Sequence, residues 1–255
     1  MRIALSFLTR LPAGRVEAED YLAALGRSAW LFPLVGLLVG GVTVAADLLA
    51  GLAFGPAPRA AAVIAAGLWV TGLLHLDGLM DTADGLGSHR SRERMLEIMK
   101  DSRVGAMGAA VGALSLLLRF ALLLEVAPPL RLPALLLAPA LGRMAITLAA
   151  GLFPTARTEG SMAASFAEHV GRERVAGALL LGLGLAALLP LAAGPAVLVR
   201  GLAAWGLGLL AALLLARSFA RRLGGLTGDT YGAINEAVEL VSLACFAAAL
   251  GRWPL

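Results

Sequence analysis

Long apolar segments separated by shorter polar stretches run through the whole chain. An α-helix needs about 20 mostly apolar residues to cross a bilayer. Seven segments approach that length: 28–51, 58–76, 104–124, 132–153, 175–193, 196–216 and 233–251. Glycine and proline recur inside them, which lipid tolerates better than water does. The pattern predicts an all-α, polytopic integral membrane helical bundle of about seven transmembrane helices, or six to eight if the short pair 175–193 and 196–216 packs differently.

The polar stretches divide this single membrane domain, residues 1–255, into parts. Residues 1–26 lack the pattern of a cleaved signal peptide and are expected to lie on the bilayer surface as an amphipathic segment. Residues 77–103 are acidic, with an interfacial helix expected near 88–101, and are the expected metal-binding segment for the reasons given below. Residues 217–239 form a glycine-rich loop and the acidic start of a helix. If the spans alternate in direction, all these parts face one side of the membrane.

The basic residues are spread unequally over the predicted loops. Of the 21 lysines and arginines, 15 fall on the side of the N-terminus and 4 on the opposite side, while Arg119 and Arg143 lie within predicted spans. Cytoplasmic loops carry the excess of positive charge, so the N-terminus is expected in the cytoplasm. We therefore predict a multi-pass membrane protein whose longest polar stretches face the cytoplasm.

The composition agrees with a membrane protein and excludes other classes. Hydrophobic residues make up 59% of the chain and charged residues 15%, against about 25% in soluble domains. The net charge is +4, but aromatic residues are only 5% and no basic stripe is interleaved with them, so no nucleic-acid partner is expected. Cys245 is the single cysteine, which excludes a disulfide framework and a cysteine metal site.

Three aspartates follow the second apolar segment with helical spacing. Asp77, Asp81 and Asp84 are at positions i, i+4 and i+7, so a helix places them on one face. Three like charges repel one another beside a membrane unless cations lie between them, and Mg²⁺ prefers hard oxygen ligands. We therefore expect a magnesium site here. The alternative is a solvated polar cap on a transmembrane helix.

The residues around these aspartates favour a substrate with phosphate groups. The glycines at positions 78, 85 and 87 are expected to let a large phosphorylated substrate approach the backbone closely. His75 precedes the aspartates and is a candidate contact for substrate or metal. The alternative is a structural role, which is more common for a single histidine near a helix end.

A cationic motif follows, with Lys100 and Arg103 on either side of Asp101. Cations beside an acidic metal site are typical of phosphate binding, so Lys100 and Arg103 are candidate phosphate clamps. The arginine-rich stretch 90–94 is more simply explained as positive-inside charge.

A glycine-rich loop leads into the last apolar segment, whose first two turns are acidic. Asp229 lies within the loop, and Glu236 and Glu239 follow with a spacing of i, i+3 on one helix face. Acidic groups at the mouth of a span are costly and usually functional. A glycine-rich loop before a helix N-terminus is suited to phosphate, so Gly228 and Asn235 are candidate substrate contacts.

Two arginines, Arg119 and Arg143, lie inside predicted spans. An arginine facing lipid costs about 3 kcal/mol or more. Both are therefore expected to face the bundle interior and to pair with the acidic residues. Arg143 has a second interpretation as a contact for a substrate phosphate.

Four motifs, in this order, resemble those of the cobalamin synthase family, the adenosylcobinamide-GDP ribazoletransferases. They are FLTRLP at 7–12, HLDGLMDTADGLG at 75–87, MKDSRVGAMG at 99–108 and TGDTYGAINEAVE at 227–239. The resemblance extends through nearly the whole chain. Met80 stands where the family usually has alanine, and Met107 where phenylalanine is common. Neither difference removes a charged group.

The resemblance implies a magnesium-dependent membrane enzyme that joins adenosylcobinamide-GDP to α-ribazole or to α-ribazole 5′-phosphate. Together with the charge distribution, it implies a multi-pass protein of the bacterial inner membrane whose active site faces the cytoplasm. The 3′-hydroxyl of the ribazole would attack the phosphorus that joins aminopropanol-cobinamide to GDP. GMP would leave, and adenosylcobalamin or its 5′-phosphate would form. The aspartate-rich helix is also similar in its chemistry, though not in its spacing, to that of CDP-alcohol phosphotransferases.

The residues and the resemblance together define a candidate site at one membrane face. We expect as metal ligands Asp77, Asp81, Asp84, Asp229, Glu236 and Glu239, as catalytic groups Asp81, Asp101 and Lys100, and as substrate contacts His75, Arg103, Arg143, Gly228 and Asn235. Asp101 or one of the clustered carboxylates would accept the proton of the hydroxyl.

Two other functions compete with this interpretation. A membrane carrier for a phosphorylated or anionic substrate should show repeat symmetry and paired broken helices near the bilayer midplane. A structural scaffold leaves the aligned aspartates unexplained. Whether the chain forms a homo-oligomer is open.

Overall fold

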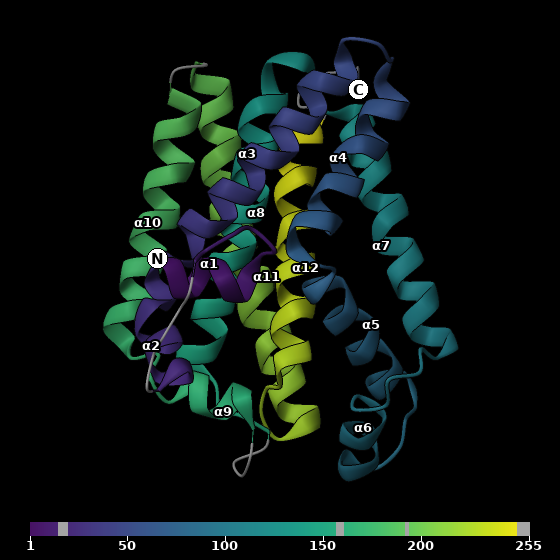
Figure 1. The fold of residues 1–255 in the computed structure, drawn as a ribbon, viewed down its shortest axis with the longest axis vertical. Helices are drawn as coiled ribbons and strands as arrows, with labels where there is room; N and C mark the ends of the chain where they lie inside the picture. Colours follow the sequence, from purple (N-terminus) through teal and green to yellow (C-terminus); the bar gives the residue numbers. More distant parts are fainter. Residues whose placement is uncertain (15–19, 157–160, 192–193, 249–255) are drawn as a thin grey trace, which may run out of the picture.

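The computed structural model is an all-helical bundle whose long helices run side by side along its longest axis (Figure 1). It describes residues 1–14, 20–156, 161–191 and 194–248. Outside these ranges lie three of the arginines counted above, Arg15, Arg157 and Arg252, and the end of the last predicted segment. The prediction of an all-α fold is confirmed, since the β pairing in the described ranges is a single isolated bridge between Thr155 and Leu226.

A long helix overlaps each predicted apolar segment, and the shorter helices lie at one side and one end of the bundle (Figure 1). In chain order the helices are α1 (Arg2–Leu8), α2 (Tyr21–Ser28), the 3₁₀ helix η1 (Ala29–Leu31), α3 (Phe32–Gly51), α4 (Pro56–Thr71), α5 (Leu74–Gly87), α6 (Arg92–Ile98), α7 (Ala106–Glu125), α8 (Pro128–Leu152), α9 (Met162–Ala167), α10 (Arg172–Leu191), α11 (Pro195–Leu223) and α12 (Gly228–Ala247). The helix predicted near 88–101 is observed as α6, over a shorter range.

Four helices among the described residues are long and apolar enough to cross a membrane. They are Tyr21–Gly51, which runs through α2 and α3, Ala106–Glu125, Pro128–Leu152 and Pro195–Leu223. α4 and α5 taken together are also long and apolar enough to cross a membrane, although a bend of 89° separates them. These helices confirm a membrane bundle, whereas the count of seven spans and the orientation of the N-terminus stay predictions.

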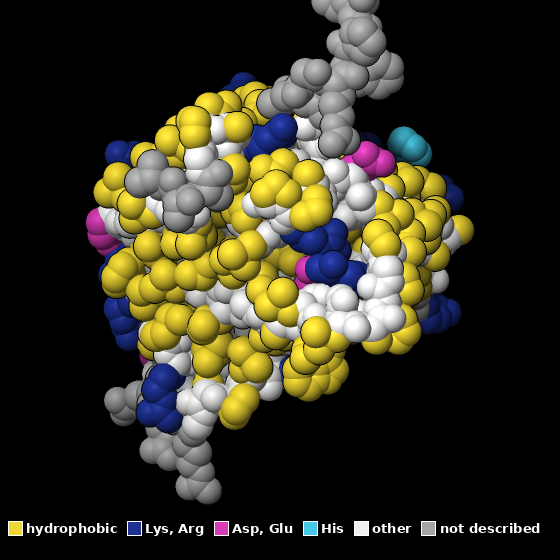
Figure 2. Space-filling model, turned by 90° about the horizontal axis from the view of Figure 1, so that it is seen from above, with side chains coloured by type: hydrophobic (Ala, Val, Ile, Leu, Met, Phe, Trp, Pro, Cys, Tyr) yellow, Lys and Arg dark blue, Asp and Glu magenta, His cyan; other side chains and the backbone are white. Residues whose placement is uncertain are grey.

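Apolar side chains cover much of the outside of the bundle. Leu48 and Leu49 on α3, Leu117 on α7 and Leu214 on α11 are each 60% or more exposed. Soluble monomers rarely expose large contiguous apolar surfaces, so these faces are suited to lipid. Seen from the end where α3 leads into α4, the surface is mainly hydrophobic, with a small group of basic side chains near its middle (Figure 2).

Opposite charges tie three helices together near the end of α3. Asp47 of α3 accepts hydrogen bonds from Arg59 of α4 at 2.5 Å and from Arg131 of α8 at 2.8 Å. Asp47 is only 4% exposed. A buried carboxylate requires such pairing, because isolated charge is costly away from water.

The centre of the bundle is α8. Within its membrane-spanning stretch 83% of the residues are buried, compared with 22% in α7 and 28% in α11. Gly36 and Gly40 of α3 lie directly against its backbone, where an added Cβ would collide with the carbonyl oxygens of Pro139 and Leu135. Small residues allow this close approach, which stabilises helix pairs in lipid through packing.

The chain breaks sharply between α4 and α5, and the N-terminal segment packs on this break. Gly72 and Leu73 both have left-handed backbone, with φ of 62° and 63°, a conformation that leucine rarely adopts. The backbone N–H of Arg10 donates to the carbonyl oxygen of Val70 at 2.8 Å, and the Arg10 side chain fills the space beside Gly72. The FLTRLP motif therefore helps to fix the direction in which α5 leaves α4.

Candidate active site

The first turn of α12 crosses α5 in backbone contact, because glycines stand at the crossing point. A Cβ on Gly78 would lie 2.8 Å from the carbonyl oxygen of Asp229, and a Cβ on Gly232 would lie 2.9 Å from that of His75. Neither gap admits a side chain, so the approach depends on glycine. The crossing brings the aspartates of α5 next to Asp229, and two motifs that are distant in the sequence meet here, as predicted.

Four carboxylates gather beside this crossing, and we call them the aspartate cluster: Asp77, Asp81, Asp84 and Asp229. The charge of Asp81 interacts with all three of the others. Asp77, Asp81 and Asp84 take part in none of the ion pairs between described residues. Like charges held together raise the energy of the site. In the described ranges, no group of three or more His, Cys, Asp or Glu side chains is arranged to hold a metal by itself.

The carboxylate of Asp84 also caps the start of α7. Its Oδ2 accepts a hydrogen bond from the backbone N–H of Gly105, and its Oδ1 accepts one from that of Gly108, both at 2.7 Å. A helix leaves these N–H groups unpaired at its N-terminus, and its dipole favours a negative charge there. A Cβ at either glycine would collide with the carboxylate. The two bonds therefore fix Asp84 in place and explain both glycines of the MKDSRVGAMG motif.

A cavity of about 410 Å³ opens beside the aspartate cluster. Its polar lining includes Asp77, Asp229 and Lys100, together with Gly228 at the N-terminus of α12. The rest of the lining is mainly apolar and comes from α1, α2, α8 and α9: Phe7, Leu8, Leu22, Ile146, Met162 and Phe166. The cavity therefore offers charged groups and an extended apolar surface to the same ligand.

The structure separates the three members of the cationic motif. Lys100 lines the cavity, whereas Asp101 and Arg103 are exposed and pair with each other, with 2.8 Å between Nη2 and Oδ2. Hydrogen bonds from the side chain and the backbone N–H of Arg103 lower the pKa of Asp101 to about 2. A carboxylate with so low a pKa is a weak proton acceptor, and this arrangement is poorly suited to the role of base.

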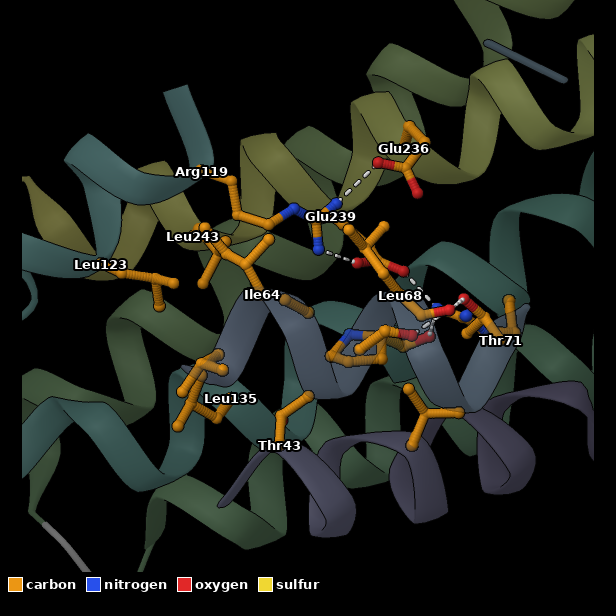
Figure 3. A pocket seen from close by; sticks show the side chains of 16 residues that line it. Thr43, Ile64, Leu68, Thr71, Arg119, Leu123, Leu135, Glu236, Glu239 and Leu243 are labelled. Carbon is orange, nitrogen blue, oxygen red and sulfur yellow. Dashed lines mark hydrogen bonds and ion pairs between the residues drawn. The ribbon is translucent and has the colours of Figure 1, made fainter. Parts of the chain in front are cut away.

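The glutamates of α12 lie in the bundle interior and form a second group, which we call the buried network. Arg119 of α7 pairs with Glu236 at 2.7 Å and with Glu239 at 2.6 Å (Figure 3). Arg143 of α8 also pairs with Glu239. The four side chains line a small cavity of about 50 Å³. The prediction that both arginines face the interior and pair with acidic residues is confirmed.

This pairing differs from the predicted roles of Glu236, Glu239 and Arg143. The sequence predicts both glutamates as metal ligands, but arginines occupy their carboxylates, and neither lines the larger cavity. A carboxylate inside a span needs a counter-charge, and the two intramembrane arginines supply it. Arg143, predicted to contact substrate, is 1% exposed and donates instead to Glu239.

A histidine, His75, connects the two groups. Its Nδ1 lies 3.3 Å from Nη2 of Arg143, and its side chain also lines the larger cavity. A guanidinium only donates, so Nδ1 accepts and the proton of the neutral ring is on Nε2. Asn235 belongs to the buried network, because it is fully buried and donates to Glu239 at 3.0 Å.

The glycines of α5 pack against protein, which corrects the expectation that they admit substrate. Met99 fills the space beside Gly85, and Met107 fills the space beside Gly87. Gly78 admits the backbone of α12. The physical reason is that α6, α7 and α12 all approach α5 closely, and each approach needs a position without a side chain.

The sequence pattern does not predict most of the apolar lining of the larger cavity. Tyr231 follows Gly228 by one helical turn, and this spacing alone places it on the same face of α12. Phe166 comes from the six-residue helix α9, whose position depends on packing. Its ring stacks on that of Phe32, with centroids 5.8 Å apart, and meets Tyr231 edge-on at 6.3 Å.

Comparisons with known proteins agree with the motifs. The chain matches the family model described as CobS, cobalamin-5-phosphate synthase, over residues 1–247. It is 42% identical over 241 residues to the adenosylcobinamide-GDP ribazoletransferase of Roseiflexus sp. (strain RS-1), covering 94% of this chain and 86% of that one. It is also 42% identical over 259 residues to the protein of the same name from Desulfitobacterium hafniense (strain Y51), covering 99% and 96%. No solved structure matches the chain.

Proposed function

The chain belongs to the cobalamin-5-phosphate synthase family, and from this premise we propose that it is an adenosylcobinamide-GDP ribazoletransferase that reacts its substrates at the aspartate cluster. The observation that carries the location is the crossing of α5 and α12 at Gly78 and Gly232, beside a cavity with acidic, basic and apolar lining. We place the protein in the bacterial inner membrane with this site toward the cytoplasm, a placement supported by the excess of basic residues in the loops on that side.

The reaction replaces one phosphorus–oxygen bond with another. The 3′-oxygen of α-ribazole, or of its 5′-phosphate, bonds to the phosphorus that carries the aminopropanol arm of cobinamide. The bond from that phosphorus to the bridging oxygen of the diphosphate breaks, GMP leaves with that oxygen, and the hydroxyl proton passes to a base. Such transfers depend mainly on positioning and on neutralising charge at the phosphate oxygens.

The donors of the aspartate cluster fit Mg²⁺. This ion is commonly held by one or two carboxylates together with substrate phosphates, and the cluster brings together hard oxygen atoms that repel one another in the structure. Asp77, Asp81 and Asp229 are the candidate ligands, of which one or two would hold the ion together with substrate phosphates, while Asp84 is fixed by its bonds to the start of α7. Bound Mg²⁺ would supply Lewis-acid stabilisation of the diphosphate and of the departing GMP.

The other roles follow from where the side chains lie. Lys100 lines the cavity together with Asp77 and Asp229, which suits it to hold a phosphate oxygen. Asp77 and Asp229, which line the cavity, are better placed to act as the base than Asp101, which does not line it and has a pKa of about 2.

The test measures GMP released by the purified protein in detergent. We expect release only when adenosylcobinamide-GDP, α-ribazole and Mg²⁺ are all present, loss of release on adding EDTA, and recovery when Mg²⁺ is restored. The variant Asp81→Asn should lower turnover more than about 100-fold. Glu97→Gln, in an exposed pair with Arg94, is the control and should keep wild-type turnover.

Two results would contradict the proposal. Release of GMP that does not require α-ribazole would exclude a transferase. Full turnover in Asp81→Asn would remove Asp81 from the reacting site.

A further inference from the structure

The cavity beside the aspartate cluster is too small for both substrates. Its volume of about 410 Å³ suits one small organic molecule, whereas a corrinoid macrocycle with its side chains is several times larger than a nucleoside. We propose that this cavity binds the benzimidazole nucleoside, α-ribazole, and that the corrinoid stays outside it. This inference rests on the proposed function and assigns one of its substrates to one subsite.

The apolar lining fits a flat aromatic base of low polarity. Phe7, Leu22, Met162 and Phe166 reach the cavity from α1, α2 and α9. A benzimidazole has no exocyclic hydrogen-bonding groups, so it gains by burying its faces against apolar side chains. The guanine of the second substrate carries several donors and acceptors, which this surface would leave unpaired at a cost. The lining therefore selects the benzimidazole over the guanine.

Two buried polar atoms of residues that line this cavity have no hydrogen-bond partner among the described residues. They are the hydroxyl of Tyr231 and Nε2 of His75. Tyr231 as a residue is 5% exposed, and His75 is 3% exposed. Buried polar groups in folded proteins are nearly always paired. Unpaired ones beside a cavity indicate a ligand that completes them, and the base nitrogen and ribose hydroxyls of a nucleoside supply suitable atoms.

The polar lining fixes the direction in which the nucleoside points. Asp77 and Asp229 belong to the aspartate cluster and line the cavity, so the cavity is polar where it meets the cluster, and Lys100 adds a cation to its lining. With the base against the apolar side chains, the ribose lies at this polar part. Its 3′-hydroxyl then meets the diphosphate arm of the second substrate, while the corrinoid remains at the surface. The opposite orientation would bury a polar sugar against apolar side chains.

The first test uses Tyr231→Phe, which removes one hydroxyl without a protein partner and leaves the ring in place. The melting temperature should not change, and the KM for α-ribazole should rise about three- to tenfold, as expected for one hydrogen bond. The KM for adenosylcobinamide-GDP should stay at the wild-type value. Ser242→Ala is the matched control, because Ser242 also carries a buried, unpartnered hydroxyl on α12 but does not line this cavity. It should change neither KM.

A second variant, Met162→Asp, places a charge on the apolar lining. Met162 is 73% exposed and begins α9, where an acidic side chain is tolerated, so the fold should be retained while the KM for α-ribazole rises. An unchanged KM for α-ribazole in both variants, or a rise confined to adenosylcobinamide-GDP, would overturn the assignment. Failure of the proposed function is distinguishable, because the wild-type protein would then release no GMP or would release it without α-ribazole.

Discussion

The aspartate cluster and the buried network share the helix α12 and are connected through His75 of α5, yet their carboxylates lie in opposite surroundings. In the buried network, Arg119 and Arg143 neutralise Glu236 and Glu239 inside the bundle. In the aspartate cluster, the three carboxylates of α5 enter no ion pair between described residues, and the cluster adjoins a cavity. Acidic side chains paired within the chain hold the helices together, whereas those left without a cation are available to a metal ion and a substrate.

The comparison predicts different costs for removing a charge from each group. Taking one partner from a buried ion pair leaves an uncompensated charge, which is strongly destabilising. Taking one carboxylate from a group of like charges relieves repulsion and should not destabilise the fold. Substitutions in the buried network should therefore affect stability, and those in the aspartate cluster should affect turnover.

The largest effect on stability is expected for Glu239→Gln. It leaves Arg143 buried without its counter-charge and should lower the free energy of unfolding by about 3–5 kcal/mol. For a chain of this size, that loss corresponds to a fall of roughly 10 °C in the melting temperature, measurable by thermal unfolding in detergent. Glu97→Gln is the matched control on the surface and should leave the melting temperature unchanged. An unaltered melting temperature in Glu239→Gln would show that the buried network does not hold the helices together.

A smaller effect is expected for Gly78→Ala, which alters the crossing that assembles the aspartate cluster. The new Cβ would lie 2.8 Å from the carbonyl oxygen of Asp229, so α12 must shift, at a cost of about 1–3 kcal/mol and with reduced turnover. Gly41→Ala on α3 is the matched control, because a Cβ there would meet nothing within 4 Å. The control should be at least as stable as the wild type. Equal unfolding free energies for the two variants would contradict the close crossing.

The smallest effect is expected for Asp101→Asn. Arg103 lowers the pKa of Asp101 to about 2 in the folded protein, so the stabilisation by this pair is present above the usual aspartate pKa and is lost only as the pH falls toward about 2. Asp101 does not titrate between about pH 6 and pH 9. The pH profile of turnover should overlay the wild-type profile, within about twofold in rate. Loss of the acidic limb in the variant would instead make Asp101 the base.

The apolar pattern predicts the long helices well, because spanning a bilayer demands length and hydrophobicity that are visible locally. The segment 58–76 shows the limit of prediction from the apolar pattern. It predicts one continuous helix, but α4 ends at Thr71, where Gly72 and Leu73 turn the chain and Arg10 packs on the turn. Gly72 is a local signal for a helix end, but the packing of Arg10, which is distant in the sequence, leaves no trace in the local pattern.

For the candidate site, the sequence predicts the meeting of Asp229 with the aspartates of α5, because both flank spans at the same side of the bundle. It does not predict that Glu236 and Glu239 lie apart from them. A helix rises about 1.5 Å per residue, so Glu239 sits about 15 Å deeper along α12 than Asp229. At that depth the nearest charges are the intramembrane arginines. The apolar lining from the six-residue helix α9 depends on tertiary packing and could not be inferred from periodicity.

The most direct test of this division of roles records the melting temperature and the GMP release of Asp81→Asn and Glu239→Gln on the same preparations. We predict that Asp81→Asn melts with the wild type but loses turnover more than about 100-fold, while Glu239→Gln melts roughly 10 °C lower and still releases GMP well below its midpoint. An Asp81→Asn protein that melts early, beside a Glu239→Gln protein that melts normally, would contradict it.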